Sequence, residues 1–476
     1  MNFKKKSINA IKWSFIDKLF KRGSKFLVAV ILARLLVPAD FGLLAMAMVF
    51  LGIGNIFADF GLGQAIIQAD NVSDKQCSTI FFINLATGFA FVAIFVSISG
   101  LIADFYGDDR LENIVKVISF SYLLNSVNLV QNMRFYRRLD FKTMTLMSVI
   151  SDVASGIFGI VLAYQGYGVW SLVFQRLSRT GLYTILIWSK SRWIPQLYFN
   201  FREIKDMFNF GVSMLGIGVL GEIFNYLDTI LMGKFLSASF LGLFDRGKSF
   251  PTFMKNTFIL PITRPLFPIF SKVKQEKDKL RKTSFSVLRN LDPLLFLGFG
   301  LMAVFSEEII LIVLNEKWLE AVPYLRIFAF ATAFASIYTV STSLYKALGK
   351  KKLLLVLSFS EKFLQLGFLL LGIFVNINYY LYGIVGVMVL AVTARLYFNN
   401  QFIGGEWMKY SARYVIFAAL SLSMIGLKQL LGNIHDHFQY LVIPIFTVLY
   451  TFFFYAFVKE KMQLAYTYVL GRWTAK

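Results

Sequence analysis

Charged side chains inside long apolar stretches are the residues of this sequence that could do chemistry. The basic ones are Lys18, Lys21, Arg22, Lys25, Arg34, Lys116, Arg176, Arg179, Arg246, Lys248, Lys255, Arg264, Arg289, Arg326 and Lys362. The acidic ones are Asp17, Asp59, Asp152, Glu222, Asp228, Asp245, Asp292 and Glu361. A charge at the bilayer centre costs roughly 2.5–3.5 kcal/mol on insertion scales. Those near helix ends can extend to the interface, so the others are expected to face a wet, mostly cationic interior.

The first apolar stretch carries a dense cationic group. Lys18, Arg22 and Lys25 are spaced i, i+4, i+7, which places them on one face of a helix, with Asp17 on a neighbouring stripe. This face is interpreted as the wall of a cationic cavity. The alternative is an amphipathic helix lying on an anionic cytoplasmic leaflet.

A second basic group, Arg246 and Lys248, lies in the string Gly-Leu-Phe-Asp-Arg-Gly-Lys-Ser over residues 242–249. The string matches the phosphate-loop pattern, but that motif follows a buried strand of a soluble α/β domain, whereas here it begins a membrane helix. Nucleotide binding is therefore not predicted. Both residues are candidates for cavity lining, or for ion pairing at the helix end. The predicted substrate-binding residues are Lys18, Arg22, Lys25, Arg246, Lys248, Arg264 and Arg289.

Four acids are candidates for an ion-coupling step: Asp17, Asp152, Glu222 and Glu361. Asp152 and Glu361 occupy matching positions of an internal repeat described below. Either could bind and release an ion, and each could equally pair with a nearby base such as Lys362. A proton or sodium gradient is therefore a candidate energy source, and no cofactor is predicted.

The composition is that of a membrane protein. Of the 476 residues, 57% are hydrophobic and 16% are charged, against roughly 45–50% and 25% in soluble domains. One cysteine excludes a disulfide framework, and with only two histidines no metal site is predicted. No Ser/His/Asp or Cys/His spacing indicates a nucleophilic enzyme. The formal charge of +22 first suggests a nucleic-acid partner.

Apolar stretches of membrane-spanning length recur along the chain and predict an all-α polytopic membrane protein with about fourteen helices. They cover residues 12–37, 41–67, 77–103, 112–133, 143–164, 167–189, 209–232, 239–270, 283–314, 319–345, 353–375, 379–399, 411–431 and 438–458. Four prolines in the stretch 239–270, at 251, 261, 265 and 268, predict kinks there because each removes a backbone donor.

The basic residues outside these stretches are distributed unevenly between the two sides. Odd-numbered turns hold only Arg110, Lys234, Lys317 and Lys428, whereas the termini and even-numbered turns hold most of the others. The positive-inside rule therefore predicts that both termini are cytoplasmic. Because topology accounts for most of the positive charge, a nucleic acid is not predicted as a partner.

An internal repeat is visible when the sequence is shifted by 200 residues. Residues 32–43 then align with residues 232–243, with Gly42-Leu43 over Gly242-Leu243, and Asp152 later matches Glu361. Two blocks of six helices insert with the same orientation, which is a parallel repeat typical of transporters. The predicted domains are an N-terminal lobe (1–195), a cytoplasmic interfacial linker helix (196–208), a C-terminal lobe (209–400) and an accessory helix pair (401–476).

Four strings resemble signatures of the bacterial polysaccharide transporters, the O-antigen-type (Wzx-like) lipopolysaccharide biosynthesis flippases of the multidrug/oligosaccharidyl-lipid/polysaccharide exporter superfamily. They are LARLLVPADFG (32–42), LGLFDRGKSFP (241–251), RPLFPIFSK (264–272) and NEKWLEAVPYLRIFAF (315–330). In relatives a tyrosine and an alanine are commoner where Phe244 and Gly247 stand. The similarity spans nearly the whole chain and specifies the family better than the substrate.

The resemblance implies a MATE-like fold of two six-helix lobes around a central cavity plus two C-terminal helices. It also implies translocation of undecaprenyl-pyrophosphate-linked oligosaccharide units from the cytoplasmic to the periplasmic leaflet by alternating access, for O-antigen, capsule or exopolysaccharide biosynthesis. The protein would then lie in the bacterial inner membrane, and other polysaccharide-assembly membrane proteins are candidate partners. A pyrophosphate carries about two negative charges, which suits a cationic interior.

Two other functions are alternatives. A membrane-embedded polysaccharide polymerase or glycosyltransferase would need a catalytic carboxylate or base, usually presented on sizeable loops, whereas the external turns here are short. A multidrug/cation antiporter of the same superfamily would need an acidic interior. We therefore predict a transporter that is not an enzyme.

Overall fold

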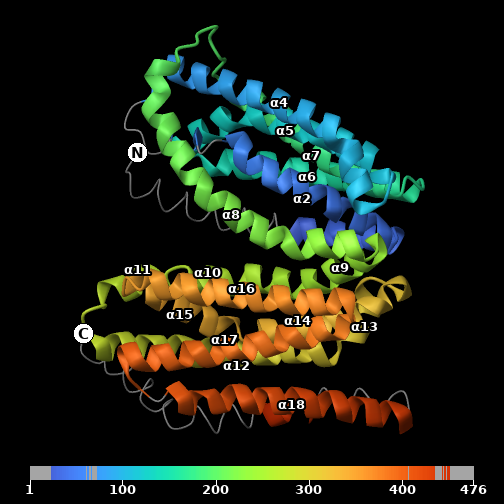
Figure 1. Ribbon diagram of the computed structural model, residues 1–476, viewed down its shortest axis with the longest axis vertical. Helices are drawn as coiled ribbons and strands as arrows, with labels where there is room; N and C mark the ends of the chain where they lie inside the picture. Colours follow the sequence, from blue (N-terminus) through green and yellow to red (C-terminus); the bar gives the residue numbers. More distant parts are fainter. Residues whose placement is uncertain are drawn as a thin grey trace. The chain divides into compact units, whose positions relative to one another are not determined.

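The described part of the chain is built from α-helices and short helical turns. The computed structural model describes residues 23–59, 62–63, 66, 72–405, 407–434, 442, 444–445 and 447–450, and these residues contain no strand. The chain divides into two compact units (Figure 1). Unit 1 comprises Met1–Asp245 and Val313–Trp318, and unit 2 comprises Arg246–Ile312 and Leu319–Lys476.

Unit 1 contains a helix over residues 23–35 and then a series of long helices. They are α2 (Pro38–Asp59), α4 (Asp74–Tyr106), α5 (Arg110–Arg137), α6 (Phe141–Tyr164), α7 (Val169–Lys190), the 3₁₀ turn η1 (Phe201–Ile204), α8 (Lys205–Phe235) and the start of α9 (Ala238–Met254). Local signals set several ends: a capping box joins Ser73 and Gln76 at the start of α4, and Gly107 ends it in the left-handed conformation at φ 71°.

Unit 2 contains the rest of α9 and the helices that follow it. They are the π-helical turn η2 (Lys255–Ile259), α10 (Leu260–Thr263), α11 (Leu266–Lys272), α12 (Lys277–Val304), α13 (Ser306–Val313, of which the last residue belongs to unit 1), η3 (Glu316–Ala321), α14 (Val322–Thr332), α15 (Ala335–Ala347), α16 (Lys351–Phe374), α17 (Ile377–Ile403) and α18 (Trp407–Ile434). Of the predicted accessory helix pair, the structure describes α18 and a few later residues.

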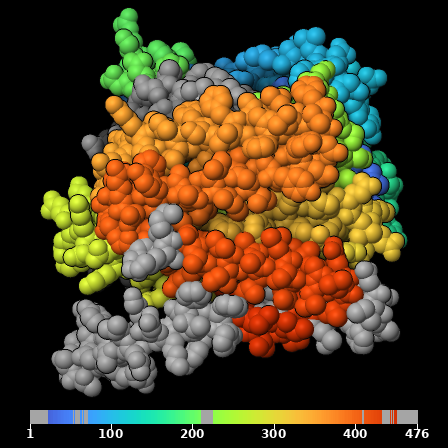
Figure 2. Space-filling model, turned by 60° about the horizontal axis from the view of Figure 1, so that its bottom comes forward, coloured from blue at the N-terminus to red at the C-terminus, as the bar shows by residue number. Residues whose placement is uncertain are grey.

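The prediction of a multi-pass helical membrane protein is confirmed. Seven described helices are long and apolar enough to cross a membrane, and α14 and α15 form an eighth span that bends by 44°. The outward face of α16 is apolar, because Leu355, Val356, Phe359 and Phe363 are all exposed. Figure 2 shows α16 and α17 as a broad orange face of unit 2. Such a face is stable against lipid tails and unstable against water.

Proline breaks the helix predicted over 239–270, as expected. The α-helical segment ends at Met254, a π turn follows over Lys255–Ile259, and Pro261 lies in the first turn of α10. Pro265 then caps α11. Pro261 and Pro265 each lie where a new helical segment begins, because a proline lacks the N–H that a continuous helix would use, whereas Pro251 and Pro268 lie within α9 and α11.

The helix predicted over 196–208 begins only at Phe201, and residues 191–200 are not helical. Hydroxyl groups of α4 hold this extended segment: Ser78 accepts from the backbone N–H of Gln196 at 3.0 Å, and Thr79 accepts from that of Asn200 at 3.1 Å. The amphipathic spacing could not reveal this, because the bonding partners lie more than 100 residues earlier in the chain.

The internal repeat has a physical counterpart at the start of α2 and α9. A Cβ added to Gly42 would lie 1.7 Å from the carbonyl oxygen of Ala238, and one added to Gly242 would lie 1.9 Å from that of Pro38. A shift of 200 residues exchanges these two contacts. The backbones at the starts of α2 and α9 therefore approach each other too closely for a side chain at either glycine.

Residues 313–318 belong to unit 1 although unit 2 flanks them in sequence. Trp318 is fully buried, its indole N–H donates to the carbonyl of Ala33 at 2.8 Å, and its ring meets Phe41 edge-on. Asn315 donates to the carbonyl of Arg34 at 3.1 Å, and the Arg34 Nε donates to that of Val313 at 2.9 Å. The guanidinium of Arg34 is therefore used to hold residues 313–318 against the helix over residues 23–35.

We expect Trp318→Phe to lower the free energy of unfolding by about 1–3 kcal/mol, because the buried carbonyl of Ala33 loses its donor. The measurement is the apparent melting temperature of the purified protein in detergent. Trp170→Phe is the matched control, since Trp170 is only partly buried. Equal melting temperatures for Trp318→Phe and the wild type would contradict a stabilising role for the Trp318 hydrogen bond.

Candidate functional site

A cationic segment runs through α9 and η2 in unit 2 and contains Arg246, Lys248 and Lys255, which are all partly buried. Lys248 and Lys255 are seven residues apart, two helical turns, and lie within electrostatic range of each other. The Lys248 ammonium also sits 5.6 Å from the centre of the Phe328 ring on α14. Two like charges close together on one helix repel each other, and Asp245 on the same helix is the acid nearest to them in sequence.

Lys255 was not among the predicted substrate-binding residues, although it had been recognised as a charge within an apolar stretch. It begins the π turn, and its carbonyl accepts from the N–H of Leu260. Among the described residues, Lys255 forms no ion pair. Single π turns inside α-helices occur frequently at functional sites, because the extra residue re-aims a side chain. The proline-rich sequence that follows was the signal for this irregularity.

Gly247 explains why the phosphate-loop pattern occurs here without phosphate-loop chemistry. A Cβ at this position would lie 2.6 Å from the Cβ of Tyr324 and 2.9 Å from the backbone nitrogen of Leu325. The glycine therefore lets α9 pack closely on α14. Its role is to position Arg246 and Lys248, which flank it on the same helix.

The other predicted substrate-binding residues do not all join this segment. Arg264 is exposed, and Arg289 on α12 is partly buried. Lys25 is exposed in unit 1. Lys18, Arg22 and Asp17 lie outside the described residues, as does the side chain of Glu222. These assignments remain predictions.

Asp152 and Glu361, the two repeat-related acids, are both engaged in ion pairs. Asp152 on α6 pairs with Arg179 on α7, and Glu361 on α16 pairs with Arg395 on α17. The side chain of Asp152 is 3% exposed, and that of Arg395 is 4% exposed. The repeat thus places an acid on one helix and an arginine on the next in both units.

Sequence reasoning named Lys362 as an example of a base near Glu361, but the partner is Arg395, which had not been singled out. The Arg395 guanidinium stacks 3.9 Å from the centre of the Tyr338 ring and also donates to the carbonyl of Ala391. Arginine suits this site because its planar group can stack and donate in several directions at once.

We expect Asp152→Asn to destabilise the protein by about 3–5 kcal/mol, because it leaves the Arg179 charge without its carboxylate. The double variant Asp152→Asn/Arg179→Gln should recover part of that loss. Apparent melting temperatures of the single and double variants test this. Strictly additive losses would show that the pair contributes no coupling energy.

The prediction that Lys428 lies in an external turn is wrong, because the residue lies within α18. It is buried on α18, where its ammonium lies 2.6 Å from Oε1 and 2.7 Å from Oε2 of Glu308 on α13. The ring of Phe305 lies below it at 5.4 Å. This lysine therefore joins α18 to α13 within unit 2 and does not report membrane orientation.

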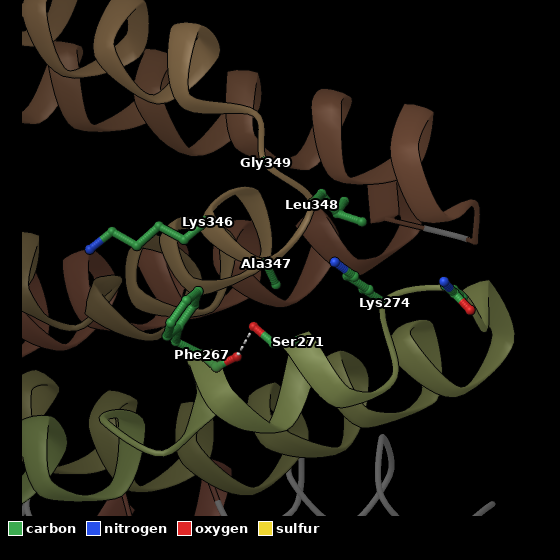
Figure 3. A pocket seen from close by; sticks show the side chains of 8 residues that line it. Phe267, Ser271, Lys274, Lys346, Ala347, Leu348 and Gly349 are labelled. Atoms are coloured by element: carbon green, nitrogen blue, oxygen red, sulfur yellow. Dashed lines mark hydrogen bonds between the residues drawn. The ribbon is translucent and has the colours of Figure 1, made fainter.

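A separate pocket of about 550 Å³ opens between the ends of α11 and α15 (Figure 3). Its lining residues are Phe267, Ser271, Lys274, Gln275, Lys346, Ala347, Leu348 and Gly349. Ser271 donates to the carbonyl of Phe267, and the amine of Lys274 points toward Ala347 and Leu348. None of the predicted site residues lines this pocket, and its lysines lie beside two helix C-termini, whose negative ends they neutralise.

Comparison with known sequences identifies relatives. A family model described as "Polysaccharide biosynthesis protein" matches residues 31–323, more than half of the chain. The teichuronic acid biosynthesis protein TuaB of Bacillus subtilis is 29% identical over 303 residues, which cover 63% of this chain and 62% of TuaB. The lipopolysaccharide biosynthesis protein WzxC of Escherichia coli is 24% identical, covering 69% of this chain and 67% of WzxC.

Comparison with solved structures identifies the fold. The lipid II flippase MurJ in an inward closed conformation superposes with a TM-score of 0.63 at 14% identity, covering 96% of this chain and all of MurJ. An inward-facing MATE family multidrug transporter of the MOP superfamily superposes with a TM-score of 0.61 at 14% identity, covering 82% and 96%. The fold expected from the resemblance is therefore confirmed.

Proposed function

The chain belongs to the polysaccharide biosynthesis protein family, and we propose on this basis that it is a flippase for polyprenyl-pyrophosphate-linked oligosaccharides. It moves each lipid-linked unit from the cytoplasmic to the periplasmic leaflet of the bacterial inner membrane, with both termini in the cytoplasm. The product serves the assembly of a surface polysaccharide such as O-antigen, capsule or exopolysaccharide. The observation that carries the proposal is the family match over residues 31–323.

The cationic segment supports an anionic lipid-linked substrate. Arg246, Lys248 and Lys255 supply guanidinium and ammonium donors on one helical segment, and charge-assisted hydrogen bonds to phosphate oxygens are roughly twice as strong as neutral ones. The pyrophosphate would bind these donors while its sugars occupy water-filled space and its polyprenyl chain stays in lipid. α9 also carries one acid, Asp245, beside Arg246, so basic groups outnumber acidic ones on this segment.

Alternating access is the mechanism that the fold supports best. Repeat-built transporters expose a fixed site first to one side and then to the other. The reciprocal crossing at Gly42 and Gly242 gives the two repeats a close, symmetric contact. The protein makes and breaks no covalent bond in this scheme, so it is a transporter and not an enzyme, and polysaccharide-assembly membrane proteins act on its product.

The test is reconstitution of the purified protein in liposomes that contain a defined undecaprenyl-pyrophosphate-linked oligosaccharide. We expect the sugar to reach the opposite leaflet unchanged in length, as scored by its accessibility to an added lectin. Elongated sugar chains would instead indicate a polymerase. Uptake of organic cations without movement of the lipid-linked sugar would indicate an antiporter.

A further inference from the structure

Hydroxyl groups, and not a basic side chain, hold a buried carboxylate in unit 2. Asp292, in the middle of α12, is only 2% exposed. Ser336 on α15 donates to its Oδ1, and on α18 Tyr410 and Tyr414 donate to its Oδ2 at 2.7 and 3.3 Å. Among the described residues, no lysine or arginine forms an ion pair with Asp292.

This environment differs from that of one buried acid, Asp152, and of two partly buried ones, Glu361 and Glu308. Asp152, Glu361 and Glu308 each contact a basic side chain directly, which keeps a carboxylate charged. Removing an unpaired charge from water costs several kcal/mol, and hydroxyl donors offset only part of that cost. A hydroxyl can also accept a hydrogen bond. The cage formed by the hydroxyls of Ser336, Tyr410 and Tyr414 therefore also accommodates a neutral carboxyl group after one hydroxyl rotates.

The charged and titratable groups around Asp292 come from α18 and from the residues that follow it. Arg413 donates to the Tyr410 hydroxyl at 3.3 Å and acts on the carboxylate at longer range. The Tyr450 hydroxyl donates to the carbonyl of Pro293, the next residue of α12. The protonation state of Asp292 therefore bears on the contacts of α18 and of the residues that follow it.

The cage also joins elements that are built to bend. Ser336 lies in the first turn of α15, directly after the 44° bend from α14. Asp292 precedes Pro293, which removes one backbone hydrogen bond from the middle of α12. Loading the carboxyl with a proton would therefore change the bonds that hold a bent span and α18 to α12.

We propose that Asp292 is a proton-binding site whose loading and release couple a proton gradient to movement of α15 and α18 relative to α12. The proposal rests on the proposed transport function. The ion we propose is a proton, because the carboxyl oxygens lie at hydrogen-bonding distance from hydroxyls that can donate to the ionised acid and, after rotation, accept from the neutral one.

A direct test does not depend on transport. Infrared difference spectra of the purified full-length protein between acidic and alkaline pH should contain a carboxylic acid band that Asp292→Asn removes. Asp278→Asn is the matched control, since Asp278 lies in the same helix with its side chain 75% exposed. Asp292→Glu should keep a displaced band, and Tyr410→Phe should shift the band because it removes one of the hydroxyl donors to the carboxyl group. The same band in Asp292→Asn as in the wild type would overturn the proposal.

The second test uses proteoliposomes loaded with the lipid-linked oligosaccharide. A pH gradient should accelerate wild-type leaflet transfer by up to about tenfold per pH unit and coupled proton, and Asp292→Asn should lose this acceleration while Asp278→Asn and Asp292→Glu keep it. An undiminished response of folded Asp292→Asn overturns the proton site. Absence of transfer by the wild type in every gradient overturns the flippase proposal instead, and the infrared result then decides the proton site alone.

Discussion

Replacing Lys248 and Lys255 together by glutamine should slow leaflet transfer of a pyrophosphate-linked oligosaccharide about 100-fold. Each hydrogen bond to a charged group contributes about 1.5–3 kcal/mol, and about 1.4 kcal/mol corresponds to a factor of ten. Glutamine keeps the side-chain volume and a donor but removes the charge. Transfer rates per protein in proteoliposomes are the measurement.

The matched control for this variant is Lys279→Gln/Lys282→Gln. It removes the same two charges from an exposed part of α12, where Lys279 pairs with Glu276 and its side chain is 64% exposed. We expect its transfer rate to stay close to that of the wild type. An equal defect in both double variants would mean that total charge, and not the cationic segment, governs transport.

Gly42→Ala should destabilise the protein by about 3 kcal/mol or more, which is the upper range for inserting atoms where no space exists. The new Cβ would lie 1.7 Å from a backbone carbonyl, so no side-chain rotation can relieve the clash. Gly242→Ala should have the same effect because its contact is the repeat-related one. The measurements are the yield of folded protein and its apparent melting temperature.

Gly100→Ala provides the control for these two variants. A Cβ at this position of α4 meets nothing within 4 Å, so alanine should stabilise the helix by about 0.5–1 kcal/mol. The account of the crossing would be contradicted if Gly42→Ala and Gly100→Ala melted at the same temperature.

Most of the fold could be predicted because a membrane helix can be identified from the apolar residues of its own sequence segment. About twenty apolar residues must form a helix in lipid, where every backbone group needs an internal partner. The spans predicted over 143–164 and 353–375 correspond closely to α6 and α16. The bend between α14 and α15 and the extended segment before Phe201 were missed, because tertiary packing and distant hydroxyl groups determine them.

The candidate site could be predicted only in part, because a charge in an apolar stretch reveals that it has a partner but not which one. Asp152 and Asp292 are both acids within apolar helices. Only the structure separates the one paired with arginine from the one held by hydroxyls. Lys428 was assigned to a turn for the same reason, since its partner Glu308 lies 120 residues earlier.

The most direct test of the central claim compares two substrates in the same proteoliposomes: one oligosaccharide linked to undecaprenol through pyrophosphate, and the same oligosaccharide on an uncharged polyprenyl linkage. The account predicts that the wild type transfers the pyrophosphate-linked form at least about tenfold faster, since the difference reflects charge-assisted bonds to the phosphates. Equal rates for the two substrates, or no transfer above protein-free liposomes, would contradict it.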